Sequence, residues 1–291
     1  MKKNQLLLIP ILFLVIGCAS PSGDAESKKI AEPVSDTLTV QDLDFLLPSP
    51  VEFLSLVHDV GFGYHPDLIN PLVSPSDYLL YRNQALNFGV YLTDFSYLLL
   101  FEKHTEAIRY LYHIQELSTL LGVENFFDDE FFNKIISNLS EHDTLRAVSI
   151  EQSTLFFNRM ESIGNKDLVL LISSGAMVEA MYLASDIISE DKISEQTITS
   201  VIDLAYLFDT FFLHYTINKS DEPTVVKLTE DLQELRNIFT SMEITQSSKA
   251  IRKDGKLVFS SEINHNVNQY NIKKMKVLLN SIRNSIVNQD Y

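Results

Sequence analysis

Three acidic residues lie inside otherwise apolar stretches, and they are the strongest candidates for chemistry in this chain. Asp94 stands in the segment VYLTDFSY, Glu179 in AMVEAMY, and Asp209 in LFDTFF. A carboxylate buried among apolar side chains must be hydrogen-bonded, paired with a positive charge or neutralised by a proton. Two such carboxylates that meet between helices could share a proton, bind a cation or line a ligand pocket.

Tyrosine hydroxyl groups near these acids offer a second interpretation. Each acid has a tyrosine within about one helical turn, and the candidates are Tyr91, Tyr97, Tyr182 and Tyr206. Three interpretations stay open at this point: a polar ligand pocket, an internally satisfied structural network, and acids that simply point to solvent. The candidate polar or ligand site therefore comprises Asp94, Tyr91, Tyr97, Glu179, Tyr182 and Asp209.

Recognisable catalytic and metal-binding motifs are otherwise missing from the sequence. There is no serine-hydrolase elbow, phosphate-binding glycine loop or dinucleotide fingerprint. Glu262 and His265 form a single Glu-x-x-His spacing, expected at the start of the last helix, whereas a di-iron bundle requires two such motifs. Asp209 and His214 are about 140° apart around a helix, so they cannot chelate one ion from a single helix. We predict no catalytic residues, no metal and no cofactor.

The N-terminal residues have the pattern of a secretory signal. Lys2 and Lys3 precede a short apolar run that ends at Ile16 and is followed by Gly17 and Cys18. The run is shorter than the roughly 20 residues that a membrane-spanning helix needs. The segment VIGC resembles the lipobox of bacterial lipoproteins, which implies cleavage before Cys18 and lipidation of its thiol. The alternatives are an ordinary signal peptide with an incidental cysteine and an uncleaved anchor.

These features predict three regions: a signal peptide at 1–17, a lipidated flexible tether at 18–42, and one helical domain at 43–291. The tether is rich in Ser, Pro, Ala and charged residues and poor in large apolar ones. Several acyl chains on Cys18 would give stable membrane attachment. Because Cys18 is the only cysteine, the chain has no intrachain disulfide, Cys–His pair or cysteine zinc site.

Composition indicates a large folded domain and excludes nucleic acid as a partner. Hydrophobic residues make up 45% of the 291 residues, which is ample for a core. Only 9 Gly and 9 Pro are present, fewer turn residues than a sandwich, barrel or propeller requires. The 23 Lys and Arg residues against 39 Asp and Glu give a net charge of −16, the opposite of a phosphate-binding surface.

Apolar periodicity predicts an all-α fold, an irregular bundle of about nine helices. The expected helices span 49–60, 76–102, 105–121, 128–139, 143–163, 166–189, 194–217, 222–243 and a last segment that includes 272–286. A short β-hairpin is expected near residues 250–259, around the Asp254–Gly255 turn. A solenoid-like helical array is the alternative architecture.

Three of these helices carry patterns that predict how they pack. The helix at 76–102 is apolar all round, which is typical of a central, buried helix. The helix at 166–189 has Gly175 beside a ridge of small residues at Ala176, Ala180 and Ala184, which favours close approach of another helix. The helix at 222–243 and the last one each show a narrow apolar stripe, so we expect them to form an outer layer, in contact with each other.

The stretch 47–186 resembles a family of uncharacterised lipoproteins of Bacteroidota. The matching segments are Pro48-Ser49-Pro50, Asn70-Pro71, the run ALNFGVY at 85–91, Asp94, Tyr97, Leu121-Gly122 and Ser174-Gly175 with Glu179 and Tyr182. Met177 departs from the family pattern, which often has an aromatic residue there. The resemblance implies an all-helical lipoprotein of the cell envelope and implies no activity.

The resemblance and the lipobox together predict a location and a class of function. Surface export in this phylum is associated with acidic residues directly after the lipidated cysteine, whereas here Ala19 to Gly23 are uncharged. We therefore expect attachment to the outer membrane facing the periplasm, with surface exposure as the alternative. A non-enzymatic binding or scaffold domain with an envelope protein as partner is the expected function. The alternative is a ligand- or metal-dependent enzyme that uses an acidic pocket between helices.

Overall fold

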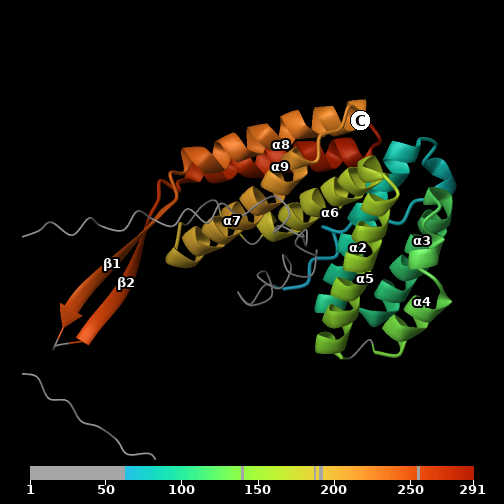
Figure 1. Cartoon of the computed structure of the whole chain (residues 1–291), viewed down its shortest axis with the longest axis horizontal. Helices are drawn as coiled ribbons and strands as arrows, with labels where there is room; N and C mark the ends of the chain where they lie inside the picture. Colours follow the sequence, from blue (N-terminus) through green and yellow to red (C-terminus); the bar gives the residue numbers. More distant parts are fainter. Residues whose placement is uncertain (1–62, 139–140, 187, 190–192, 254–255) are drawn as a thin grey trace, which may run out of the picture. The chain divides into compact units, whose positions relative to one another are not determined.

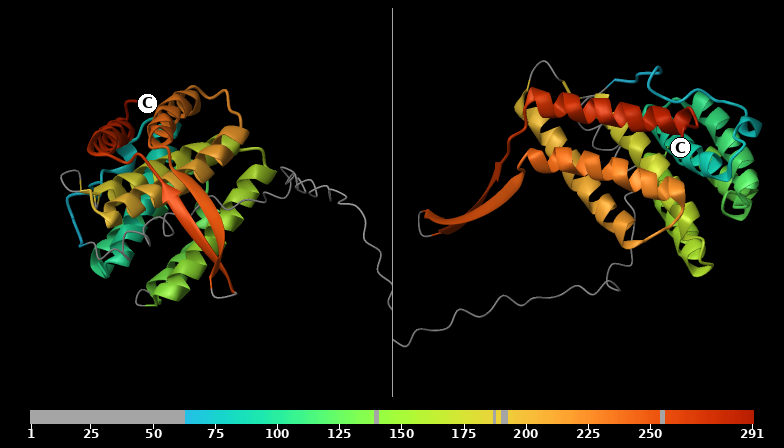
Figure 2. Two further views of the ribbon diagram at one scale, coloured as in Figure 1. Left: turned by 90° about the vertical axis from the view of Figure 1, so that its left-hand side faces the viewer. Right: turned by 90° about the horizontal axis from the view of Figure 1, so that it is seen from above.

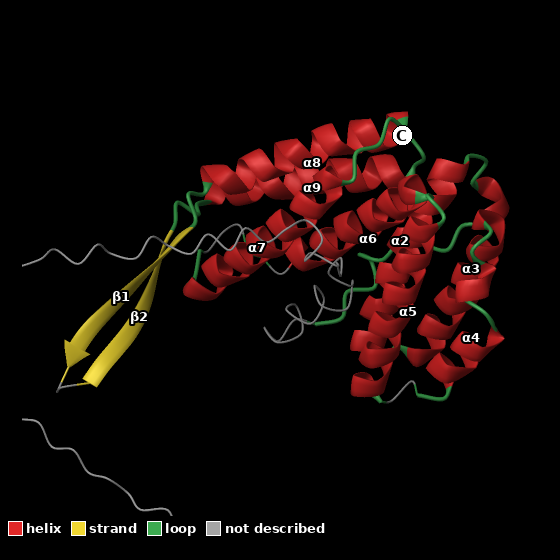
Figure 3. Cartoon of the chain, in the orientation of Figure 1, coloured by secondary structure: helices red, strands yellow, loops and turns green. Residues whose placement is uncertain are grey.

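The computed structural model describes residues 63–138, 141–186, 188–189, 193–253 and 256–291. The expected signal peptide, the tether with Cys18 and the helix at 49–60 lie outside these residues. Within the described part of the chain the fold is all-α, as predicted (Figures 1 and 3). The α-helices are α2 (Tyr81–Leu100), α3 (His104–Leu121), α4 (Asp129–Ile136), α5 (His142–Ser162), α6 (Lys166–Asp186), α7 (Glu195–Ile217), α8 (Pro223–Ser241) and α9 (Gln269–Val287). Two short 3-10 helices, η2 (Pro75–Asp77) and η3 (Glu124–Phe126), precede α2 and α4.

Helix ends follow the capping residues of the sequence. The side chain of Ser194 accepts a hydrogen bond from the Thr197 amide at the start of α7, and Asp128 caps α4 in the same way. Gly122 ends α3 in a left-handed conformation with φ 69°. The helix expected from residue 76 begins only at Tyr81, because Pro75–Asp77 forms a 3-10 turn and Leu80 is extended.

The helices α2 and α6 cross with their backbones in close contact. A Cβ atom on Gly175 would overlap the carbonyl oxygen of Leu86, and one on Gly89 would overlap that of Ile172. The two helices therefore touch backbone to backbone, and the hydroxyl of Thr93 donates to the Ala176 carbonyl across the contact at 3.1 Å. The predicted close approach at Gly175 is confirmed, with Gly89 as its counterpart on α2.

The helices α8 and α9 lie side by side and pack against each other, as their stripes predict (Figure 2). The stripe residues Leu228, Leu232 and Leu235 of α8 and Met275 and Leu279 of α9 are fully buried. In addition, α9 packs on α6, which brings the C-terminal helix against the centre of the domain.

One helix, α6, is long and apolar enough to cross a membrane among the residues described. Of its most apolar window, 83% is buried inside the protein. Burial by other helices is the normal environment of a core helix in a globular domain, and the contacts of α6 with α2, α5 and α9 provide it.

An antiparallel hairpin, β1 (Thr245–Lys253) and β2 (Lys256–Asn264), connects α8 to α9. Its register pairs Ala250 with Phe259 and Ile251 with Val258, so the predicted hairpin is confirmed and is longer than expected. Glu262 belongs to β2 and His265 follows the strand, whereas α9 begins only at Gln269. The expected helical placement of Glu262 and His265 is therefore wrong, because the residues up to Asn264 pair with β1 in the hairpin and α9 begins after them.

Candidate functional site

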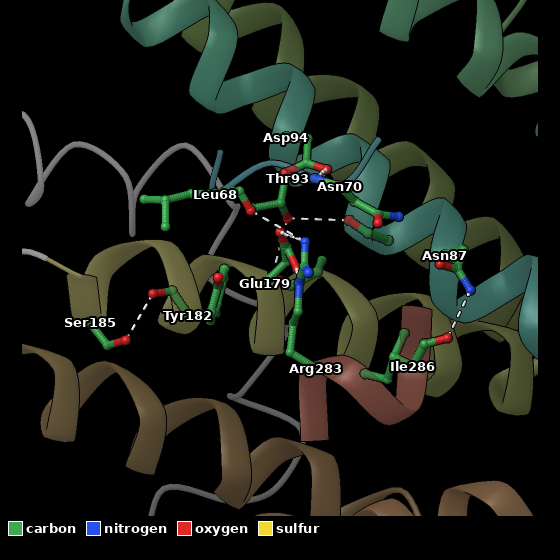
Figure 4. A network of polar contacts seen from close by, with 12 residues as sticks. Leu68, Asn70, Asn87, Thr93, Asp94, Glu179, Tyr182, Ser185, Arg283 and Ile286 are labelled. Carbon is green, nitrogen blue, oxygen red and sulfur yellow. Dashed lines mark hydrogen bonds and ion pairs between the residues drawn. The ribbon is translucent and has the colours of Figure 1, made fainter. Parts of the chain in front are cut away.

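Two of the three predicted acids meet at the centre of the domain. Asp94 from α2 and Glu179 from α6 are both completely buried, with 0% exposure. Figure 4 shows them converging with the guanidinium group of Arg283, which α9 supplies. The α2–α6 crossing brings the two acids together, and the packing of α9 on α6 adds the positive charge.

Glu179 and Arg283 form a two-pronged ion pair. The Nε and Nη2 atoms of Arg283 donate to Oε2 and Oε1 of Glu179 at 2.9 and 3.1 Å. Nη2 also donates to the main-chain carbonyl of Leu68 at 3.3 Å, and the guanidinium lies 4.8 Å from the ring centre of Tyr182. Both carboxylate oxygens are thus satisfied, which is the condition under which a buried charge pair is tolerated.

Asp94 holds the chain segment 64–74, which we call the strap loop. Its Oδ2 atom accepts a hydrogen bond from the Asn70 amide at 3.0 Å. Its Oδ1 atom has no partner at standard hydrogen-bond geometry among the described residues. Burial raises the pKa of the Asp94 carboxyl group well above its usual value, and the negative charge of Glu179 raises it further.

The charges of the cluster balance when Asp94 carries a proton. Burial also raises the pKa of Glu179, but the charge and hydrogen bonds of Arg283 oppose this, so Glu179 is the ionised member of the pair. A neutral Asp94, an ionised Glu179 and a protonated Arg283 sum to zero. With Asp94 neutral, two like charges do not face each other in the core.

Tyrosine hydroxyl groups complete the attachment of the strap loop. Tyr91 donates to the Pro71 carbonyl at 3.0 Å, and Tyr97 accepts from the His65 amide at 2.9 Å. Tyr110 of α3 donates to the Asn70 carbonyl at 2.7 Å. A loop without a hydrogen-bonding strand partner needs such side chains to satisfy its buried backbone groups. For Tyr91 and Tyr97 the structure therefore favours the interpretation as an internally satisfied network, because both hydroxyl groups bond to the strap loop.

Asp209, the third candidate acid, does not belong to this cluster, so the interpretation that an acid points to solvent applies to it. Its side chain is 56% exposed and accepts from Arg236 Nε of α8 at 2.7 Å. The neighbouring Tyr206 is 47% exposed, so this side of α7 faces outward although it is rich in apolar residues. His214 lies instead on the buried side of α7, where burial lowers its pKa.

Arg283 and the strap loop are the parts of the site that the sequence reasoning missed. Arg283 stands four residues after Leu279 and three before Ile286, at the edge of the apolar stripe of α9. A charged residue in such a position is a signal that its head group reaches a buried partner. The contacts of Leu68 and Asn70 depend on tertiary packing, and no local pattern reveals them.

The hydrogen bonds of the cluster tie α2, α6, α9 and the strap loop together, which is the geometry of a structural clamp. No group of three or more His, Cys, Asp or Glu side chains suited to a metal occurs in the part of the chain that is described. The Glu179 carboxylate and the Arg283 guanidinium group bond to each other, and the guanidinium group also bonds to the Leu68 carbonyl of the strap loop. Comparisons with protein-family models, curated proteins and solved structures found no match to this chain.

Proposed function

We propose that this protein is a lipid-anchored domain of the bacterial cell envelope that binds a partner or ligand without catalysing a reaction. The observation that supports the non-catalytic assignment is the closed Glu179–Arg283 pair, in which both carboxylate oxygens are bonded and unexposed. Asp94, the other buried acid, holds the Asn70 amide of the strap loop. A general acid, a base or a metal ligand needs access to substrate or ion, which these groups lack.

The anchoring part of the proposal rests on the sequence. The segment VIGC, the basic start and the short apolar run support lipidation of Cys18, and the resemblance to Bacteroidota lipoproteins supports the same assignment. We place the protein on the outer membrane, facing the periplasm. The net charge of −16 supports protein or small-molecule partners over nucleic acid.

A second candidate is a cation- or ligand-dependent protein that uses Asp94. The unpartnered Oδ1 atom of this buried carboxyl group is the observation that favours it. The position of Asp209 on the surface weakens it, because a third acid is then missing from the cluster. Stabilisation of the protein by added Ca²⁺, Mg²⁺ or Zn²⁺, lost in Asp94→Asn, would support this candidate over the clamp.

Metabolic labelling with a palmitate analogue tests the anchor. Wild type should incorporate the label and fractionate with outer membranes, whereas Cys18→Ser should incorporate none and accumulate as precursor. The matched control is Ser20→Cys in the Cys18→Ser background, which restores a thiol two residues away and should stay unlabelled. Label in the Cys18→Ser protein would show that the lipobox interpretation is wrong. Proteins captured with the wild-type chain from native membranes and identified by mass spectrometry would then define the partner.

A further inference from the structure

An open pocket of about 410 Å³ lies apart from the buried acids. The first turn of α2, the first turns of α8, the second half of α9 and residues 290–291 line it. Its volume falls in the range of small-molecule sites in proteins. Most of its lining side chains carry hydroxyl groups or charges, so its natural occupant is a polar molecule.

Three hydroxyl groups of the pocket have no partner among the described residues. Thr224 lies in the first turn of α8, is only 5% exposed and lines the pocket, yet no hydrogen bond engages its side chain. Ser281 and Ser285, one turn apart on α9, also line the pocket with hydroxyl groups that are not used in the fold. Other helical Ser and Thr residues, such as Ser118 and Thr240, bond to carbonyl groups of their own helix. Ser281 is exposed, Ser285 is half-buried, and none of the three hydroxyl oxygens is enclosed without a partner, so all three can bond to solvent or to a ligand in the pocket.

Charges in the pocket balance each other. Lys227 Nζ contacts Asp231 Oδ1 at 2.8 Å, and Asp231 Oδ2 accepts from the hydroxyl of Tyr291 at 2.8 Å. Arg82 Nε donates to the main-chain oxygen of Tyr291 at 2.9 Å, and Asp290 adds a second acid. The two cationic and two acidic side chains leave no positive excess that would attract an anion, while each offers donors or acceptors to a neutral polar ligand.

The pocket also has an apolar wall. Leu278 and Ile282 of α9 form it, and Tyr291 adds an aromatic ring. Saccharides present a rim of hydroxyl groups around a face of C–H groups. A wall of aliphatic and aromatic carbon beside free hydroxyls and paired charges matches both features of such a molecule.

We propose that this pocket binds a small, uncharged polyhydroxylated ligand, of the size of a monosaccharide or disaccharide. Its hydroxyl groups bond to Thr224, Ser281, Ser285 and the paired charges, and its C–H face packs on the apolar wall. The assignment rests on the proposed function as a binding domain and names the class of ligand.

Isothermal titration of the purified full chain tests this site. The protein is kept in a detergent without a sugar head group, because a glycoside detergent would compete. Glucose, galactose, mannose, N-acetylglucosamine and the disaccharides maltose and lactose are titrated at millimolar concentration, beside inorganic phosphate and glucuronate. We expect at least one neutral sugar to bind and both anions to fail.

Thr224→Val removes one hydroxyl at constant shape and should weaken sugar binding roughly two- to tenfold, the usual value of one hydrogen bond. The matched control is Thr240→Val on the same helix, which lies outside the pocket and should bind as wild type does. Absence of binding by every sugar, wild-type affinity in Thr224→Val, or binding of the anions alone would overturn the assignment. Cys18→Ser should retain sugar binding, so a failure of the proposed lipid anchor can be distinguished from a failure of the proposed sugar site. Chemical change of a bound sugar, detected by mass spectrometry, would refute the proposed non-catalytic function but would still support the pocket as a sugar-binding site.

Discussion

Removing the positive charge of Arg283 is the most informative perturbation of the buried cluster. Arg283→Met keeps much of the aliphatic volume but deletes both hydrogen bonds to Glu179 and the bond to Leu68. Because Glu179 is completely buried, its carboxylate would lose its compensating charge without gaining water. Breaking a buried ion pair from one side typically costs about 3–5 kcal/mol, and we expect this loss in the free energy of unfolding.

A double-mutant cycle separates the pair from its surroundings. Glu179→Gln removes the negative charge, and the single remaining carboxyl group, Asp94, can then ionise opposite Arg283, so we expect a loss of only about 1–2 kcal/mol. In the double variant, Arg283→Met with Glu179→Gln, both charges of the buried pair are removed together. The double variant should therefore be more stable than the sum of the single losses predicts, by about 0.5–3 kcal/mol.

Urea unfolding of the full chain at neutral pH, followed by circular dichroism, measures these differences. Arg236→Met is the matched control, because Arg236 pairs with the exposed Asp209 and such surface pairs contribute about 0–1 kcal/mol. A loss for Arg283→Met no larger than for Arg236→Met, or strict additivity in the cycle, would refute the reasoning that Glu179 is a buried ion held by Arg283.

Two further predictions concern protonation and packing. Because the fold raises the pKa of Asp94, the folded state holds this proton more tightly than the unfolded chain does. The unfolding free energy should then fall as pH rises from about 4 toward the raised pKa, by up to about 1.4 kcal/mol per pH unit for this one group. The fall should be clearly smaller in Asp94→Asn, which lacks the titrating carboxyl group, and parallel curves of unfolding free energy against pH for the two proteins would contradict the prediction. Gly175→Ala should cost about 1–3 kcal/mol or more, because the new methyl group overlaps the Leu86 carbonyl, whereas Gly63→Ala enters open space and should be near neutral. Equal melting temperatures for the two variants would disprove the close crossing.

The helices could be predicted from the sequence because their signals are local. Apolar periodicity defined their cores, and residues such as Ser194, Asp128 and Gly122 set their ends. The hairpin followed from a two-residue turn between apolar runs, but its length depends on cross-strand pairing, which placed Glu262 in a strand.

The candidate site could be predicted only in part. Asp94 and Glu179 stand on helices that are apolar on all sides, so the pattern favoured burial but left exposure to solvent open. Asp209 stands on a similarly apolar helix, but α7 leaves Tyr206 and Leu213 exposed, and the pattern does not tell which side faces out. The position of Arg283 at the edge of the apolar stripe of α9 hints at a buried partner, but the identity of that partner depends on where α9 crosses α6, which no local pattern reveals.

The central claim is that the buried acids clamp the strap loop and do not hold a ligand, and the exchange rate of the Asn70 amide hydrogen tests it most directly. This hydrogen is donated to Asp94 Oδ2, so nuclear magnetic resonance should find it strongly protected in wild type. Protection should be lost in Asp94→Ala, which removes the acceptor, and should not change when Ca²⁺, Mg²⁺ or Zn²⁺ is added to wild type. An Asn70 amide that exchanges as fast as an open chain, or gains protection only when a metal ion is added, would contradict the clamp.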